Sequence, residues 1–321
     1  MSEKLLEVRN LKTYFYTKSG VAPAINDISF SIDKGKTLGV VGESGCGKSM
    51  TALSIMKLIP DPPGKIVGGE IQFEGRDLLK LDEKAMREIR GKDISMIFQE
   101  PMTSLNPVFT VGDQIMEALL MHGKIKKKEA REIAIEMLST VKIPDPQKRI
   151  NEYPHQLSGG MRQRVMIAMA LCCKPKLLIA DEATTALDVT IQAQILHLIN
   201  DLRSRLDTSV LFITHDLGVI SQIADEVIVM YAGNIVESAS IREIFKNPLH
   251  PYTKGLLECV PDVGRRNKTL HVIKGMVPSL YKLPKGCPFC PRCDAALPRC
   301  QDEKPEFVLK DGHSVRCILY R

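Results

Sequence analysis

The sequence lacks several features that would place it in a specialised class of protein. Within its 321 residues no apolar run approaches the roughly 18 residues that a membrane-spanning helix needs. The first residues, Met1–Glu7, carry charges where a secretory signal would carry an apolar core, so we expect a cytoplasmic protein. We find no internal repeat and no low-complexity tract, which excludes repeat architectures.

The chain also lacks a strong charge of either sign. Its 44 basic and 38 acidic residues give a formal net charge of +6, a weak basis for a nucleic-acid surface. One lysine cluster, Lys124 with Lys126–Lys128, precedes apolar residues at helical spacing, so we predict a solvated helix face and no nucleic-acid partner. Nine cysteines in a chain without an export signal argue against a disulfide framework.

Residues 42–49 form a complete phosphate-loop motif, G-x-x-x-x-G-K-[ST], which follows a short apolar run near residue 40. The run Thr37–Val41 predicts a buried strand, and Met50–Leu58 predicts the helix after the loop. Backbone N–H groups of such a loop wrap a triphosphate, Lys48 adds a positive charge, and the Ser49 hydroxyl is a candidate Mg²⁺ ligand. The predicted nucleotide-binding residues of this loop are Gly42, Ser44, Gly45, Cys46, Gly47, Lys48, Ser49 and Met50.

A second apolar run predicts a strand that ends in two carboxylates. Lys176 is followed by the apolar residues 177–180, and Asp181 and Glu182 come directly after them. Asp181 is a candidate Mg²⁺ ligand, through water, and Glu182 is a candidate for polarising the water that attacks the γ-phosphate. Both residues are predicted parts of the nucleotide site.

A second glycine-rich loop lies at the start of a predicted amphipathic helix, Met161–Leu171. Ser158, Gly159 and Gly160 there expose backbone N–H groups at a helix start, which is how proteins hold phosphate. A single phosphate-loop domain does not need this second loop for itself. The simplest use of both loops is a dimer in which each second loop closes on the ATP of the partner subunit.

The remaining pattern completes an α/β arrangement. Alternating residues predict strands at 5–15 and 25–33, and most of 102–157 reads as helical. A helix at 190–205, a strand at 210–214 and a hairpin at 227–237 follow. Beyond residue 240 prolines become frequent and periodicity fades, so we predict domains at 1–240 and 241–321.

These loops, in this order, resemble the ATP-binding cassette (ABC) ATPases over roughly residues 4–240. The resemblance implies a P-loop NTPase fold: a RecA-like α/β core with an antiparallel β-subdomain and a helical subdomain. It also implies further site residues. Gln99 resembles the glutamine of the family's Q-loop, which contacts Mg²⁺ or water, and His215 resembles the histidine that contacts the γ-phosphate. Ala186, Leu187 and Asp188 resemble the D-loop, which is the segment that crosses the dimer interface. Phe15 is the first candidate for stacking on adenine, with Tyr14 and Tyr16 as rivals.

Further phrases resemble the ATPase subunits of oligopeptide and dipeptide importers. They are residues 98–107, 181–188, 247–253 and 286–293. The resemblance implies a second ATPase subunit, identical or more often different, two membrane permease subunits and an extracytoplasmic peptide-binding protein. It implies a peripheral position on the cytoplasmic face of the membrane. A nickel importer is the close alternative, and a soluble ABC ATPase acting on nucleic acid or ribosomes is the other.

Five of the nine cysteines lie in the last 35 residues. Cys287, Cys293, Cys300 and Cys317 match the cysteines that recur in this subfamily, which implies a metal staple in a segment with little core of its own. Cys290 is an addition to that pattern. We expect a [4Fe–4S] cluster on the four matching cysteines first, structural Zn²⁺ second and unmetallated thiols third, with Cys290 left free.

Overall fold

The computed structural model describes all residues except 1–2, 100–104, 124, 185–187, 260–271 and 311. The chain divides into two compact units. Unit 1 comprises residues 1–5, 32–36 and 80–213, and unit 2 comprises residues 6–31, 37–79 and 214–321. Ala186 and Leu187, which were predicted to belong to the D-loop, lie outside the described residues. The two units are described separately below.

Unit 1 combines a short parallel sheet with a group of helices. Strands β6 (Ile94–Ile97) and β8 (Ser209–Thr214) flank β7 (Leu177–Asp181), and both pairings are parallel. All five residues of β7 are buried, as expected for a parallel strand that is covered on both faces. The helices are α2 (Glu83–Ile89), α4 (Val111–His122), α5 (Lys127–Thr140), α6 (Pro146–Arg149), α7 (Gly159–Leu171) and α8 (Val189–Leu206).

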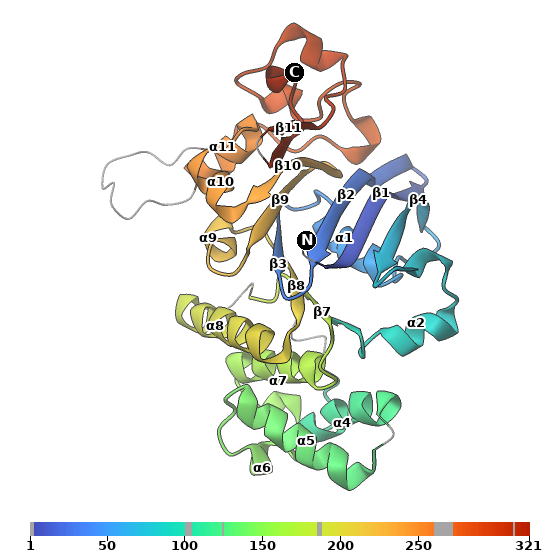
Figure 1. The fold of residues 1–321 in the computed structure, drawn as a ribbon, viewed down its shortest axis with the longest axis vertical. Coiled ribbons are helices and arrows are strands. Elements are labelled where there is room, and N and C mark those ends of the chain that lie inside the picture. The colour runs from blue at the N-terminus through green and yellow to red at the C-terminus, as the bar shows by residue number, and fades with distance from the viewer. Residues whose placement is uncertain (1–2, 100–104, 124, 185–187, 260–271, 311) are drawn as a thin grey trace. The chain divides into compact units, whose positions relative to one another are not determined.

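Helices α4, α5 and α7 pack on one another (Figure 1). Their starts follow from capping residues: the Thr110 hydroxyl accepts from the Asp113 N–H before α4, and Ser158 does the same for α7. The apolar face of α5 is buried through Ala130, Ala134 and Leu138. The lysines at its start lie on the solvated side, as the sequence predicts.

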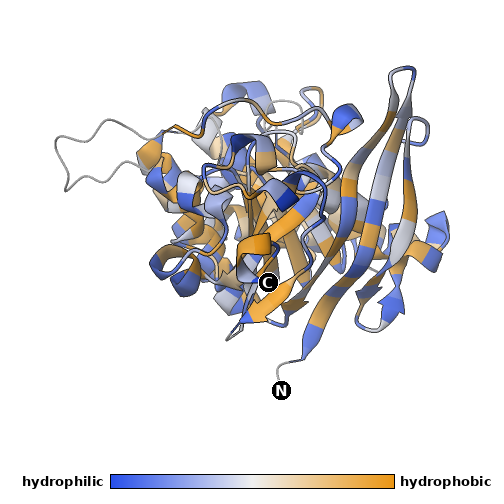
Figure 2. Ribbon diagram, turned by 90° about the horizontal axis from the view of Figure 1, so that it is seen from above, coloured by the Kyte–Doolittle hydropathy of each residue, from blue (hydrophilic) through white to orange (hydrophobic). Residues whose placement is uncertain are grey.

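Unit 2 contains an antiparallel sheet in the order β2-β1-β4-β5. Its strands are β1 (Lys4–Thr17), β2 (Gly20–Asp33), β4 (Gly64–Phe73) and β5 (Arg76–Asp77). Apolar and polar residues alternate along β1 and β2, which Figure 2 shows as changing colours along the strands. Leu6, Val8 and Leu11 are buried on one face, because successive strand residues point to opposite faces.

The other strands of unit 2 form a series that ends at β3 (Thr37–Val41). Strand β3 pairs in parallel with β9 (Glu226–Tyr231), which forms the predicted hairpin with β10 (Asn234–Ser240). Two strands that the sequence analysis missed, β12 (His313–Val315) and β11 (Val308–Lys310), extend this sheet beyond β10. The helices of unit 2 are α1 (Lys48–Ile55), α9 (Leu217–Ile220), α10 (Ile241–Lys246) and α11 (Pro251–Glu258).

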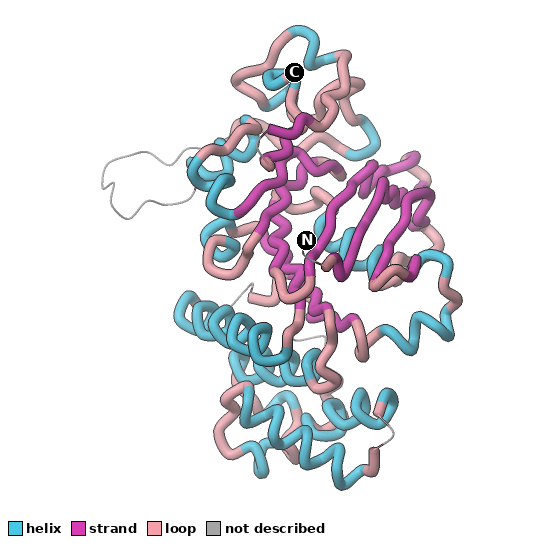
Figure 3. The backbone as a smooth tube through the Cα atoms, viewed as in Figure 1, coloured by secondary structure: helices cyan, strands magenta, loops and turns pink. Residues whose placement is uncertain are grey.

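The described residues after α11 lie mostly in loops and short 3-10 turns (Figure 3). It is fixed to β10 through Glu237, which is fully buried. The Glu237 carboxylate accepts hydrogen bonds from the N–H groups of Leu249 and His250, and the His313 ring contacts it at 2.6 Å. A buried carboxylate needs such partners, so Glu237 holds β10, the start of α11 and β12 together.

Candidate functional site

The phosphate loop of unit 2 has the strand–loop–helix context that the sequence predicts. Strand β3 ends at Val41, the loop follows, and α1 begins at Lys48. Gly42, Gly45 and Gly47 have φ of 155°, 75° and 106°, a region that favours glycine. A Cβ at Gly45 would meet nothing within 4 Å. The loop therefore keeps an open side, as close approach of a phosphate group requires.

Lys48 is buried and directed back into its own loop. Its Nζ donates to the carbonyl oxygens of Gly42 at 2.8 Å and Glu43 at 3.1 Å. The N–H of Cys46 also donates to the Glu43 carbonyl, at 3.3 Å. Burial raises the pKa of the Cys46 thiol, which keeps it neutral. The remaining predicted nucleotide-binding residues also belong to unit 2: Ser44 lies in the loop, and Ser49 and Met50 lie in the first turn of α1.

The two predicted carboxylates of unit 1 lie at the end of β7. Asp181 is buried and is the last residue of that strand. Glu182 has a φ of 47°, which is uncommon for a residue other than glycine. Its N–H donates to the Ile213 carbonyl at 2.9 Å, and its side chain accepts from the Gln99 amide at 3.0 Å. The structure therefore brings Gln99 and Glu182 together.

The second glycine-rich loop and Asp188 both lie at helix starts in unit 1. The Ser158 hydroxyl accepts from the Met161 N–H at 3.4 Å, and Gly159 and Gly160 form the first turn of α7. Asp188 caps α8, because its carboxylate accepts from the Ile191 N–H at 2.9 Å. Ser158 and Asp188 thus have a structural role as caps in addition to any role toward nucleotide.

The other predicted site residues belong to unit 2. His215 follows β8 and is exposed. The three aromatic residues of β1 differ in their surroundings. Phe15 lies opposite Gly64 of β4, the Tyr14 hydroxyl donates to Asn26 at 3.3 Å, and Tyr16 is 51% exposed. Tyr16 therefore has the most accessible ring of the three.

A set of contacts at Glu43 was missed by the sequence analysis. The Arg292 guanidinium donates to both carboxylate oxygens of Glu43, at 2.7 and 3.1 Å. The Glu43 N–H donates to the Tyr252 hydroxyl at 2.9 Å. Glu43 and Arg292 are 249 residues apart in the chain, so no local pattern in the sequence signals their pairing.

The five C-terminal cysteines surround one small hollow. Cys287, Cys290, Cys293, Cys300 and Cys317 line a cavity of about 10 Å³ beside Phe289 and His250. Burial raises the pKa of Cys287 to about 11, and the nearby Cys317 and Cys300 thiols add to the rise. None of the nine cysteines forms a disulfide.

The structure does not support the predicted metal site. Among the described residues, no group of three or more His, Cys, Asp or Glu side chains is arranged to hold a metal ion. Cys290, which we expected not to bind the metal, lines the same hollow as the other four cysteines. The short 3-10 turns at 290–292 and 298–301 bring the thiols near one another without a ligand arrangement.

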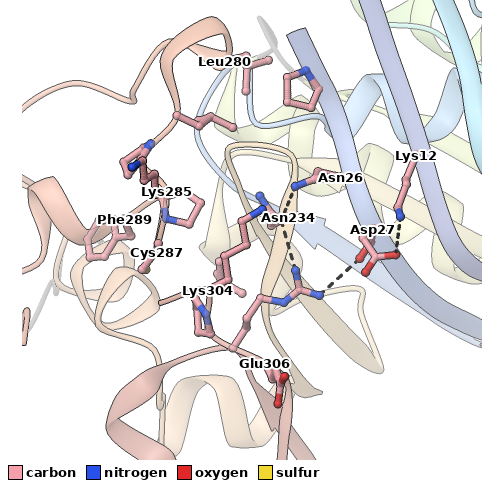
Figure 4. Close-up of a pocket in the computed structure, with 18 of the residues that line it drawn as sticks. Lys12, Asn26, Asp27, Asn234, Leu280, Lys285, Cys287, Phe289, Lys304 and Glu306 are labelled. Carbon is pink, nitrogen blue, oxygen red and sulfur yellow. Dashed lines mark hydrogen bonds and ion pairs between the residues drawn. The ribbon is translucent and has the colours of Figure 1, made fainter. Parts of the chain in front are cut away.

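A larger cavity of about 1000 Å³ lies elsewhere in unit 2 (Figure 4). Lys12 and Asp27 from the antiparallel sheet face Asn234, Lys285 and Lys304 across it. Lys12 and Asp27 form an ion pair at 3.8 Å, and the Arg316 guanidinium donates to the Asn234 side chain at 3.3 Å. None of the phosphate-loop residues lines this cavity.

Comparison with known proteins agrees with the motifs. The family model described as "ABC transporter" matches residues 25–185, and "Oligopeptide/dipeptide transporter, C-terminal region" matches residues 236–300. The chain therefore belongs to the ABC transporter family of P-loop ATPases, and its C-terminal region belongs to the oligopeptide/dipeptide transporter type.

The similarity to individual relatives extends along nearly the whole chain. The oligopeptide transport ATP-binding protein AppD of Bacillus subtilis is 55% identical over 98% of this chain and 97% of its own length. The dipeptide transport ATP-binding protein DppD of the same organism is 53% identical over 99% and 95%. A solved dimeric ATP-binding cassette in a post-hydrolysis state bound to ADP and Pi has a TM-score of 0.66. It is 27% identical and covers 74% of this chain and 99% of that one.

The comparisons support the α/β P-loop fold and ATP hydrolysis coupled to transport. They give no support to an iron–sulfur cluster. In the part of the chain that the structure describes, no helix is both long enough and apolar enough to cross a bilayer.

Proposed function

We propose that this protein is the ATP-hydrolysing subunit of a membrane importer for oligopeptides or dipeptides. The observation that carries the proposal is the 53–55% identity, over at least 98% of the chain, to ATP-binding proteins named for oligopeptide and dipeptide transport. The match of residues 236–300 to the corresponding C-terminal region supports the same substrate class. A nickel importer and a soluble ATPase acting on nucleic acid or ribosomes are not favoured.

The proposed roles toward nucleotide are given for each unit by itself. In unit 2, the loop N–H groups and Lys48 would bind the β- and γ-phosphates, with His215 toward the γ-phosphate. In unit 1, Glu182 would polarise the attacking water, and its hydrogen bond with Gln99 supports a shared role. Mg²⁺, when bound, would neutralise phosphate charge. Ser49, Asp181 and Gln99 are its proposed ligands.

We propose that two ATPase subunits act as a pair. Ser158, Gly159 and Gly160 of one subunit would contact the ATP of the other, and Asp188 would lie at the shared interface. The open N-terminal turn of α7 supports a phosphate contact, since a Cβ at Gly159 would meet nothing within 4 Å. ATP would then favour the closed pair and ADP the open one.

The remaining assignments are also proposals. The proposed domains are 1–240 and 241–321; the C-terminal family model begins at residue 236, shortly before the proposed boundary. Phe15, Tyr14 and Tyr16 remain the candidates for stacking on adenine. The proposed partners are a second ATPase subunit, two permease subunits on the cytoplasmic face of the membrane and, indirectly, a peptide-binding protein.

Substitution Glu182→Gln tests the ATPase mechanism. Loss of a general base lowers turnover by about 10²–10⁴-fold, whereas ATP binding should persist because the phosphate loop is unchanged. Binding of a fluorescent ATP analogue and phosphate release would be measured on the same preparation. The exposed Glu88→Gln is the matched control and should keep full activity. Unchanged turnover in Glu182→Gln would remove this residue from the role of general base.

Fractionation of cells that express the whole importer tests the transport assignment. The protein should co-purify with both permease subunits from solubilised membranes, and deletion of its gene should abolish uptake of labelled dipeptide or oligopeptide. Uptake of nickel instead of peptide would support the first alternative. Association with ribosomes alone would refute the transport assignment.

We infer that the cysteine-lined hollow is the place where a metal would bind, on Cys287, Cys293, Cys300 and Cys317. Support comes from the five thiols that line it, since soft thiolates bind zinc and iron–sulfur clusters. A [4Fe–4S] cluster is the first candidate and Zn²⁺ the second. The cavity of about 10 Å³ has room for roughly one water-sized body, so a four-iron cluster would have to displace the side chains around it.

Anaerobic purification followed by iron, sulfide and zinc analysis distinguishes these cases. About four irons and four sulfides per chain, with broad visible absorption, would identify a cluster. One zinc without colour would identify a structural site. Cys290→Ser should leave metal content intact, whereas Cys300→Ser should reduce it. Metal-free protein under anaerobic conditions would refute both assignments.

A further inference from the structure

The contacts at Glu43 connect the phosphate loop to the C-terminal region. Glu43 follows the first glycine of the loop, and its side chain is 30% exposed. Arg292 lies between Cys290 and Cys293, and its side chain is only 4% exposed. The ion pair is bidentate: Nη1 of Arg292 donates to one carboxylate oxygen of Glu43, and Nη2 donates to the other. Bidentate pairs with buried donors are among the stronger hydrogen-bonded contacts in proteins.

Arg292 is itself held in place from several sides. Its Nε donates to the Lys274 carbonyl at 2.9 Å and its Nη2 to the Ile273 carbonyl at 3.3 Å. Its Nη1 also reaches the Tyr231 hydroxyl at 3.4 Å. An arginine guanidinium is always protonated in proteins, so Arg292 brings a full positive charge to Glu43. The guanidinium that meets Glu43 is therefore held in place by other contacts within the protein.

A second contact fixes the backbone at the same residue. The Glu43 N–H donates to the hydroxyl of Tyr252, which belongs to α11 and is fully buried. The Tyr252 ring packs against Tyr231 and Phe289, with centroids 4.7 and 5.4 Å away. Phe289 precedes the turn that carries Arg292. One aromatic cluster thus supports both the residue that holds the Glu43 side chain and the one that holds its backbone.

A carboxylate inside a loop that binds a triphosphate has an electrostatic disadvantage. Two negative groups a few ångströms apart repel each other, and the repulsion is strong where solvent is limited. Arg292 supplies the opposite charge, and Tyr252 holds the backbone of the same residue. We propose that Arg292 and Tyr252 of the C-terminal region are positioning residues that neutralise and fix Glu43, so that the phosphate loop accepts ATP. This inference rests on the proposed role of the loop.

Substitution Arg292→Met should expose the cost of the unpaired carboxylate. We expect the apparent Kd for a fluorescent ATP analogue to rise about tenfold, since hydrogen bonds to charged groups contribute roughly this much. Arg292→Lys keeps the charge without the bidentate geometry and should lie between Arg292→Met and wild type. Arg242→Met, at an exposed arginine of α10, is the matched control and should bind as wild type does.

The double variant separates neutralisation from packing. If the unpaired carboxylate causes the loss, Glu43→Ala combined with Arg292→Met should recover ATP affinity to within about threefold of wild type. If Arg292 only supports the C-terminal fold, Glu43→Ala would rescue nothing, and the proposal would be wrong. Tyr252→Phe should weaken ATP binding in both backgrounds, because it removes the partner of the Glu43 N–H.

Three measurements on every variant and one further variant, Lys48→Ala, serve as controls. Thermal unfolding, thiol content and metal content are measured for every variant, since Arg292 lies among the cysteines. Lys48→Ala should abolish binding; if wild type and Lys48→Ala bind ATP equally, the proposed function of the loop fails. If wild type binds ATP and Arg292→Met binds it equally well, only the present inference fails.

Discussion

At the residue scale, the phosphate loop shows which features the sequence could predict. The glycines of the motif predict positive φ, and Gly47 has a φ of 106°. A Cβ there would lie 2.5 Å from the Ala24 carbonyl oxygen, so the position excludes every other residue on two grounds. The partners of Glu43 were not predictable: Tyr252 and Arg292 lie in two phrases that carry the resemblance, but neither phrase signals a pairing with a residue 209 or 249 positions away.

Substitution Gly47→Ala should therefore disrupt the loop. Strain at a positive φ costs about 1–3 kcal/mol, and the clash with Ala24 adds to it, so ATP affinity should fall at least tenfold. Gly75→Ala is the matched control: its φ is 77°, and a Cβ there meets nothing within 4 Å. That variant should lose about 1 kcal/mol of stability and bind ATP normally. Equal ATP affinity in the two variants would contradict this account.

At the element scale, helix α11 depends on a buried histidine. His250 precedes the helix, and its Nδ1 accepts a hydrogen bond from the Tyr252 N–H at 3.1 Å. Burial lowers the pKa of His250 to about 3, and the charge of Lys254 adds to the effect. The ring must be neutral to accept this hydrogen bond, so its protonation opposes the folded state.

The sign of the pH effect follows from this pKa. The unfolded chain binds a proton below about pH 6.5 and the folded chain does not, so stability falls as pH drops from about 6.5 toward 3 by up to about 1.4 kcal/mol per unit. His250→Asn keeps a capping acceptor without the titration and should flatten this slope. Chemical unfolding at pH 7, 6 and 5 measures it. The neighbouring Glu237 and His313 are present in both proteins, so the difference between the slopes isolates His250.

At the scale of the whole molecule, several elements predicted from local periodicity are present, whereas the sequence analysis predicted no long-range strand pairing. The hairpin of β9 and β10 and helix α8 lie where the patterns indicate them. Strands β11 and β12 were missed, because each is three residues long and too short for a periodic signal. Their pairing beside β10 joins segments about 75 residues apart in the chain, which a local pattern does not encode.

Removal of residues 241–321 should expose what these strands cover. Strand β10 would become an unpaired edge, and Glu237 would lose the partners supplied by Leu249, His250 and His313. We expect the shortened chain to aggregate or to unfold at least 10 °C lower, measured by light scattering and thermal unfolding. Removal of Arg321 alone is the control and should change little. A soluble shortened chain of unchanged thermal stability would show that residues 1–240 fold independently.

The contact between Glu43 and Arg292 also has a consequence for synthesis. The two residues are separated by 249 positions, and ribosomes add about 5–20 residues per second. The phosphate loop therefore leaves the ribosome tens of seconds before the arginine that neutralises it. Full affinity for nucleotide should therefore appear only when almost the entire protein has been made.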